Sequence, residues 1–74
     1  MTTTITSPYL VILYMKSDAG KVTTARRQFA DEATAEEFAV ALLGADAPDG
    51  TVIGTSLFLM NEDGTMNTLN EWEF

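Results

Sequence analysis

Carboxylates are the only side chains in this sequence whose type and spacing suggest chemistry. The candidate pairs are Glu36 with Glu37, Glu62 with Asp63, and Glu71 with Glu73. Two neighbouring carboxyl groups can divide acid and base roles in hydrolysis, and their oxygens also suit hard cations such as Ca²⁺. Histidine and cysteine are absent, so the imidazole bases, thiol nucleophiles and thiolate metal ligands of most sites are missing. The chain also lacks a Gly-rich phosphate loop.

Each carboxylate pair has a structural explanation as well. The first falls at the start of an expected helix, where the macrodipole favours negative charge, and the second falls in an expected turn. The third alternates outward on an expected strand, and the stretch "NEDGTMNTLNE" lacks the ligand spacing of an EF-hand loop. We therefore expect a protein that is not an enzyme and that uses no catalytic residue, metal or cofactor.

Charge is sorted along the chain. All four basic residues precede position 28, whereas residues 28 to 74 contain ten carboxylates and no base. The formal net charge of −7 opposes binding to nucleic acid or anionic lipid, both of which attract Lys and Arg. The pattern allows two interpretations: an acidic surface that only keeps the protein soluble, or an interface for a larger protein with a basic surface.

The second interpretation names two sets of candidate partner-binding residues. The acidic set is Asp31, Glu32, Glu36, Glu37, Glu62, Asp63, Glu71 and Glu73, and the basic set is Lys16, Lys21, Arg26 and Arg27. Charged residues around an interface raise the association rate and make binding sensitive to salt.

Length and composition predict one small cytoplasmic domain. A chain of 74 residues buries only about 60% of its unfolded surface, and without cysteine it has no disulfides to support a thin core. The apolar run "YLVILYM" is far shorter than the roughly 20 residues of a transmembrane helix, and no basic segment precedes it as in a signal peptide. Residues 1–7 are Thr-rich and expected to be disordered or loosely attached, which leaves residues 8–74 as the domain.

The first half of the domain has the pattern of a β-hairpin. Residues 9 to 15 are continuously apolar and predict a central strand buried on both faces. The turn "SDAGK" leads into a more polar strand at residues 21 to 29. Because side chains alternate along a strand, Arg26 and Arg27 must point to opposite faces.

A helix and a second hairpin are expected to follow. "TAEE" matches a capping box that starts a helix at Thr34, and Gly44 suits its left-handed end. Residues 44 to 50 have the composition of a loop, residues 51 to 60 form a strand with a possible bulge at Gly54, and "NEDG" turns into a strand at residues 65 to 74. Strict alternation places Met66 and Trp72 on the same face of that last strand.

These elements predict an α+β fold, a single small ββαββ domain with an antiparallel sheet and one helix packed on one face. The core is expected to include Leu10, Ile12, Tyr14, Phe38, Leu42, Ile53, Phe58 and Trp72.

Small size, acidity, the absence of catalytic residues and the ββαββ order together resemble the small acidic phage-encoded host-takeover proteins. Within that group the pattern is similar to the short regulators that bind and inhibit bacterial RNA polymerase. The resemblance covers the whole chain through its pattern and not through a motif, so it assigns no role to an individual residue. It implies inhibition of transcription initiation by protein–protein contact in the host cytoplasm. The contact either occupies a basic nucleic-acid channel or disturbs the initiation factor.

Two other functions fit the same residues. One is an anti-CRISPR or nuclease inhibitor that imitates the phosphates of nucleic acid, and the other is a small structural or assembly module whose carboxylates only solubilise it. Co-purification from a host lysate separates the three, because each predicts a different set of captured proteins.

Overall fold

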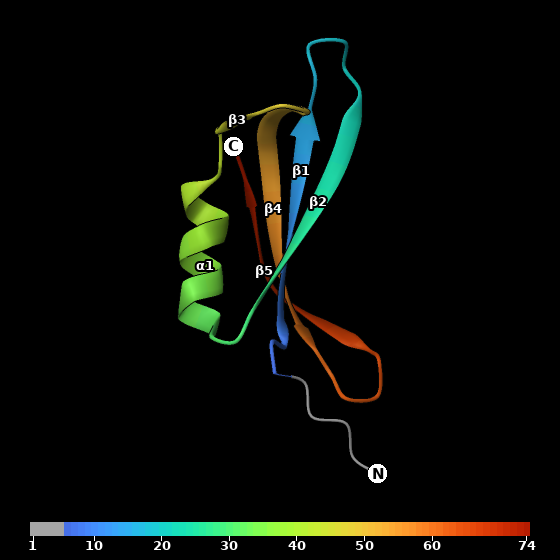
Figure 1. Cartoon of the computed structure of the whole chain (residues 1–74), viewed down its shortest axis with the longest axis vertical. Helices are drawn as coiled ribbons and strands as arrows, with labels where there is room; N and C mark the ends of the chain where they lie inside the picture. Colours follow the sequence, from blue (N-terminus) through green and yellow to red (C-terminus); the bar gives the residue numbers. More distant parts are fainter. Residues whose placement is uncertain (1–5) are drawn as a thin grey trace.

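A computed structural model describes residues 6–74 of the chain, and Figure 1 shows the arrangement of its elements. In chain order these are β1 Tyr9–Lys16, β2 Val22–Phe29, α1 Glu32–Ala41, β3 Asp46–Ala47, β4 Gly50–Met60 and β5 Met66–Glu73. The five strands form one antiparallel sheet, so the α+β class with a single helix in this part of the chain is confirmed. Residues 1 to 5 of the predicted loose segment lie outside the described residues, and the Pro8 carbonyl accepts a hydrogen bond from the Met60 amide at 2.8 Å.

Strand β1 lies in the middle of the sheet, as its apolar sequence predicts. It pairs with β2 on one side and with β4 on the other, both antiparallel. The far side of β4 is shared by two partners, with β3 at its beginning and β5 along the remainder. The order is therefore ββαβββ, because the loop expected at residues 44 to 50 contains the short strand β3.

The extra strand β3 exists because its connection to β4 is a tight turn. Pro48 and Asp49 form the turn, and Ala47 pairs with Gly50, whose φ of 132° a side chain would rarely adopt. The composition of this segment indicated a turn correctly, but two residues are too few to produce an alternation that predicts a strand.

Helix α1 begins earlier than the capping box predicts, so the assignment of Thr34 as N-cap is wrong. Asp31 is the N-cap: its backbone is extended, with φ −128° and ψ 133°, and its carboxylate accepts from the Thr34 amide at 2.8 Å. The Thr34 hydroxyl donates to the same oxygen, also at 2.8 Å. Aspartate is as good an N-cap as threonine, and here it adds almost one turn to the helix.

The end of α1 is stabilised by a residue from the sheet. In a regular helix the Leu43 amide would donate to the Ala39 carbonyl, but here it donates to the Val40 carbonyl at 3.3 Å. The Ala39 carbonyl instead accepts from the buried Thr55 hydroxyl at 3.2 Å. Gly44 has the predicted positive φ, 77°, and its amide donates to the Val52 carbonyl at 2.8 Å. Strand β4 therefore satisfies backbone groups that the helix end leaves open.

The buried core consists of strand residues and helix alanines that share one cluster: Val11, Leu13, Ala35, Ala39 and Leu57. Both alanines are fully buried. We call the side of the sheet that carries this cluster the Val11 face and the other side the Ile12 face.

The predicted core is wrong in its choice of face. Phe38, Leu42 and Trp72 are partly buried against the cluster, but Ile12 and Tyr14 are only partly buried on the opposite face. Of the eight predicted residues only Leu10 is classed as buried, at 4% exposure, and Phe58 lies partly buried beside it on the Ile12 face. Every residue from 9 to 15 is apolar, so the pattern carried no signal to show which face would hold the buried cluster.

Two bulges change the alternation along the sheet. In β4 the extra residue is Ile53, directly before Gly54, and its side chain is 37% exposed instead of buried as predicted. In β5 the extra residue is Leu69: Thr68 pairs with Phe58, whereas Asn70 pairs with Leu57. Met66 therefore lies on the Ile12 face while Trp72 lies on the Val11 face, so their predicted placement on one face is wrong.

Candidate functional site

The eight acidic candidate residues lie in three separate places. Four belong to α1 and its N-cap, two to the turn between β4 and β5, and two to β5, and all eight are exposed. Glu36 and Glu37 lie in the middle of the helix and not at its start as expected, because α1 begins at Glu32. In chain order the groups are Asp31, Glu32, Glu36 and Glu37, then Glu62 and Asp63, then Glu71 and Glu73. Each group therefore needs its own assessment as a binding surface.

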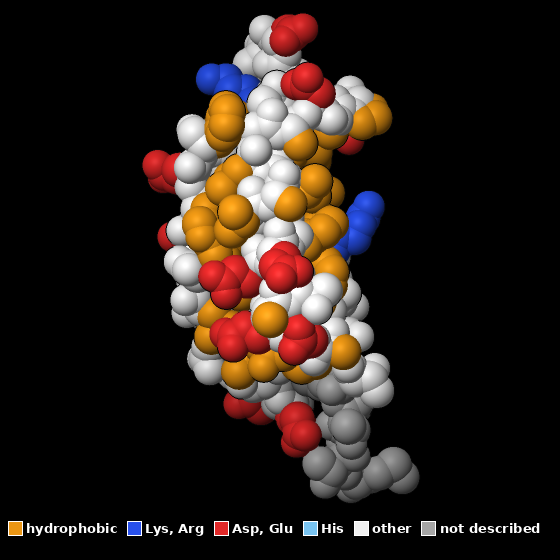
Figure 2. Space-filling view, turned by 90° about the vertical axis from the view of Figure 1, so that its left-hand side faces the viewer, with side chains coloured by type: hydrophobic (Ala, Val, Ile, Leu, Met, Phe, Trp, Pro, Cys, Tyr) orange, Lys and Arg blue, Asp and Glu red, His pale blue; other side chains and the backbone are white. Residues whose placement is uncertain are grey.

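The outward side of α1 combines carboxylates with exposed apolar groups. Ala33, Glu36, Glu37, Val40 and Ala41 follow helical spacing on the side away from the buried Ala35 and Ala39, and they line a shallow groove of about 460 Å³. The Val40 side chain is 47% exposed. Figure 2 looks onto this side of the molecule and shows hydrophobic surface interrupted by carboxylates, with Lys and Arg visible only at the margins. We call these five residues the α1 outer face.

Asp31 has a structural role beside that surface. The Thr34 amide and then the Thr34 hydroxyl donate to its carboxylate, and these bonds lower the pKa of Asp31 below its ordinary value of 3.8. A carboxylate used in this way starts the helix on which Glu36 and Glu37 stand. Asp31 therefore positions the α1 outer face.

The turn between β4 and β5 uses its aspartate in the same manner. Asp63 accepts from the Thr65 hydroxyl at 2.6 Å and from the Thr65 amide at 2.9 Å, and these bonds lower the pKa of Asp63. Asn61 closes the turn, since its amide donates to the Thr65 carbonyl at 2.8 Å and its side chain to the Thr65 hydroxyl at 2.9 Å. The adjacent Glu62 is exposed, so this turn offers one carboxylate for contact and one for structure.

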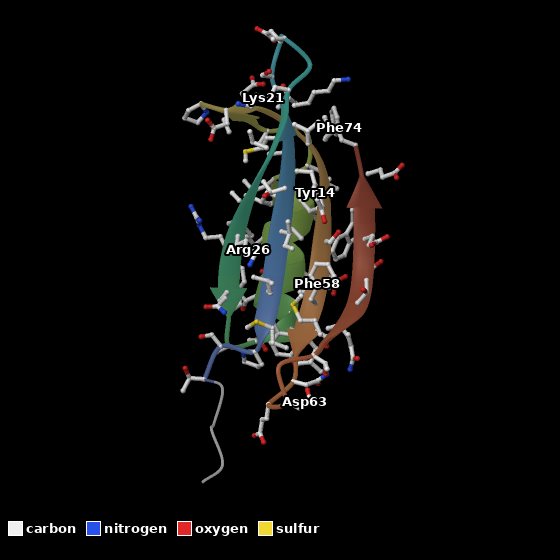
Figure 3. The ribbon with its side chains drawn as sticks, turned by 90° about the vertical axis from the view of Figure 1, so that its right-hand side faces the viewer. Tyr14, Lys21, Arg26, Phe58, Asp63 and Phe74 are labelled. Carbon is white, nitrogen blue, oxygen red and sulfur yellow. The ribbon has the colours of Figure 1, made fainter. Side chains whose placement is uncertain are left out.

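Glu71 and Glu73 belong to the Ile12 face, which Figure 3 shows with the helix ribbon behind the sheet. Strand pairing aligns the side chains of this face in rows that run from β2 across β1 and β4 to β5. Three rows are complete: Arg26–Ile12–Ser56–Glu71, Thr24–Tyr14–Gly54–Glu73 and Gln28–Leu10–Phe58–Thr68. Tyr14, Arg26 and Phe58 are labelled in Figure 3. The Ile12 face is therefore apolar along its middle strands, basic on β2 and acidic on β5.

A second groove opens over Gly54 on the Ile12 face. Its volume is about 390 Å³, and its lining includes Tyr14, Gly54, Ser56, Glu71 and Glu73. A Cβ at Gly54 would lie 3.2 Å from the Trp72 carbonyl oxygen, closer than side chains are normally placed. The missing side chain leaves a depression between an aromatic ring on one strand and two carboxylates on another.

The four basic candidate residues do not form one patch. Lys16 ends β1 and Lys21 follows the β1–β2 turn, whereas Arg26 and Arg27 lie farther along β2 (Figure 3). Arg26 pairs with Ile12 and Arg27 pairs with Val11, so the two arginines lie on opposite faces as the alternation predicts. The Arg27 Nη1 group donates to the Arg26 carbonyl at 2.8 Å.

Sequence reasoning missed the apolar part of both surfaces. The exposed Val40 stands seven residues after Ala33 on the α1 outer face, and that spacing was a usable signal. On the Ile12 face, the juxtaposition of Tyr14 with Gly54 depends on the bulge at Ile53, which no pattern located to the residue.

The described part of the chain, residues 6–74, contains no cluster of three or more carboxylates arranged to hold a metal ion. No helix in the same range is long and apolar enough to cross a membrane. Comparisons with protein-family models, with curated proteins and with solved structures each give no match to this chain.

Proposed function

We propose that this protein is a non-catalytic, protein-binding inhibitor that docks the α1 outer face on a basic surface of a larger protein. The observation that carries the proposal is the exposed Val40 beside Glu36 and Glu37 around one groove. A small apolar centre with charged residues at its rim is the usual composition of a transient protein interface. The side chains are also rigidly presented, because they stand on a helix with a strong N-cap.

We infer that α1 packs across the Val11 face and presents its outer face on the opposite side. The shared cluster of Ala35 and Ala39 with Leu57 supports this, as does the bond from Thr55 to the helix end. Contact with the sheet fixes the helix along its length, so binding needs little ordering of this element.

The expected partner is bacterial RNA polymerase, whose transcription initiation the protein inhibits in the host cytoplasm. An enzyme that holds nucleic acid needs Lys and Arg along its channel, and carboxylates compete for those groups. The resemblance to phage-encoded polymerase regulators supplies this target, and the acidic α1 outer face supplies the matching charge. A nuclease complex has basic surfaces for the same reason and is the second target to test.

The test measures binding to purified RNA polymerase and inhibition of promoter-dependent transcription. Reversing two charges, Glu36→Lys with Glu37→Lys, should weaken both by at least about tenfold, since close charge pairs at interfaces are coupled by more than 1 kcal/mol. Wild-type binding should also weaken as salt rises from about 50 to about 200 mM, because exposed charges are screened.

The matched control is Asp18→Lys with Asp49→Lys, which changes the net charge equally but in exposed turns outside α1. The control variant should bind and inhibit like wild type. Equal losses in both variants would indicate attraction to the overall charge, and the α1 outer face would not be the site. If the wild-type protein does not bind polymerase but binds a nuclease complex, the proposed target is wrong and the α1 outer face remains the proposed binding surface.

A further inference from the structure

We propose that the Ile12 face is a self-association surface on which a second copy of this chain docks face to face. The surface differs from the α1 outer face, so the inference does not depend on the proposed function. Its starting point is the row Arg26–Ile12–Ser56–Glu71, which crosses four strands with a base at one end and an acid at the other.

A two-fold axis between two such faces can run along the strands or across them. An axis that runs along the strands, between β1 and β4, places β2 of one copy over β5 of the other and β1 over β4. Each row of one copy then faces the same row of the second copy, with its order reversed. Arg26 then faces Glu71 of the second copy, twice per dimer. An axis across the strands places β2 over β2 and β5 over β5, which opposes like charges. The charge pattern therefore selects the first axis.

In two of the three rows, the same axis places a large side chain opposite a small one. In the row Thr24–Tyr14–Gly54–Glu73, Tyr14 meets Gly54 of the second copy, over the groove of about 390 Å³. In the neighbouring row, Ile12 meets Ser56. Packed sheets are stabilised when side chains of the two inner faces interdigitate in this way. The Thr24 hydroxyl is placed to donate to Glu73 of the other copy.

The size of the face sets the expected affinity. Four strands about 4.8 Å apart, over the eight positions at which β1 is paired and at about 3.3 Å per residue, cover roughly 500 Å² per copy. Two copies together then bury an area near the lower limit of specific interfaces, roughly 1,000 Å². We expect a reversible dimer with a dissociation constant of roughly 1 to 100 μM, as weak interfaces of this size give.

Analytical ultracentrifugation between about 1 μM and about 1 mM tests the proposal through the average mass. Arg26→Glu and Glu71→Arg, each alone, place like charges opposite each other twice per dimer and should raise the dissociation constant by at least about tenfold. An equimolar mixture of the two variants restores both opposite-charge contacts in the mixed dimer. The mixture should therefore associate with nearly wild-type affinity, although each variant alone is mainly monomeric.

The matched control is Arg27→Glu, which makes the same charge change one residue away on the Val11 face. It should dimerise like wild type. Wild-type protein that stays monomeric to about 1 mM, an Arg27→Glu variant as impaired as Arg26→Glu, or a mixture that stays monomeric would each overturn the proposal. Circular dichroism of every variant verifies the fold, and both arginines and Glu71 are exposed, so folding should be retained.

Discussion

The two faces of one sheet differ in what they contain, although the same strands build both. On the Val11 face, Val11 and Leu57 are at most 2% exposed and pack against helix alanines. On the Ile12 face, Ile12 and Phe58 are only partly buried, and charged side chains stand at the two edges. The helix alanines share their buried cluster with the Val11 face, whereas the described residues of the Ile12 face include partly exposed apolar groups between charged edges.

If the Ile12 face binds a second copy as proposed, stability and recognition belong to opposite faces of one sheet. Among the described residues, the core cluster joins helix alanines to the Val11 face, and no residue of the Ile12 face belongs to it. The apolar middle strands of the Ile12 face and its oppositely charged edges are the features on which the proposed association rests. Substitutions that distinguish the faces therefore test the division directly.

The largest expected effect is on the Val11 face. Leu57→Ala should lower the free energy of unfolding by about 2 to 5 kcal/mol, because it removes a fully buried side chain and leaves a cavity in the core cluster. Denaturant unfolding monitored by circular dichroism at a few micromolar protein measures this.

The matched substitution on the other face is Ile12→Ala. It should cost only about 1 kcal/mol in the dilute protein, since the Ile12 side chain is partly exposed there. Equal losses for Leu57→Ala and Ile12→Ala in dilute solution would mean that the two faces are equally covered, and the comparison would fail.

Local signals predicted much of the fold. The turns at residues 17 to 21 and 61 to 64, the two hairpins and the central place of β1 follow from short-range patterns of Gly, Asp and apolar residues. The buried face did not follow, because residues 9 to 15 are apolar on both sides and contain no alternation that distinguishes the two faces. The bulge residues Ile53 and Leu69 were likewise set by pairing between strands, which a single strand sequence does not encode.

A smaller effect separates two threonines that both belong to the Val11 face. Thr55 donates to the Ala39 carbonyl at 3.2 Å, whereas the buried Thr23 hydroxyl has no hydrogen-bond partner among the described residues. Thr55→Val should lower the free energy of unfolding by about 1 kcal/mol, because the helix-end carbonyl loses its donor. Thr23→Val removes an unsatisfied hydroxyl, so it should be neutral or stabilising by up to about 1 kcal/mol.

Thermal or denaturant midpoints of the two valine variants measure this difference. A destabilised Thr23→Val variant would show that its hydroxyl has a partner in solution, such as an ordered water. An unchanged Thr55→Val variant would show that the Ala39 carbonyl finds another donor.

The candidate surfaces were predictable only in their charges. All eight carboxylates are exposed, as the composition suggested, but their division into three groups required the strand order and the turn positions. Asp31 and Asp63 were assigned to partner binding, yet each accepts hydrogen bonds that hold its own backbone segment. A carboxylate placed two or three residues before a threonine has local donors, and that spacing is visible in the sequence at both positions.

The smallest expected effect concerns those two aspartates and the pH dependence of stability. Hydrogen bonds from Thr34 and Thr65 lower the folded pKa of Asp31 and Asp63, while in the unfolded chain both titrate near the ordinary 3.8. The folded protein therefore binds fewer protons than the unfolded one just below that value. The contribution of Asp31 and Asp63 to the free energy of unfolding is fully present above about pH 5 and is lost as the pH falls through their folded pKa values.

Asp31→Asn keeps an oxygen that can cap the helix but cannot titrate. The free energy of unfolding near pH 7 should therefore change little, and it should fall less steeply as the pH is lowered. The double variant Asp31→Asn with Asp63→Asn should show a still weaker fall of the free energy of unfolding at low pH. Thr34→Val is the matched control: it removes the hydroxyl donor and keeps the amide, so the acid loss should fall between those of wild type and Asp31→Asn. Urea unfolding from pH 2.5 to pH 7 measures all four proteins. Parallel curves for wild type and Asp31→Asn would show that the N-cap carboxylate does not set the acid stability, because the loss would then arise from carboxylates outside the start of α1.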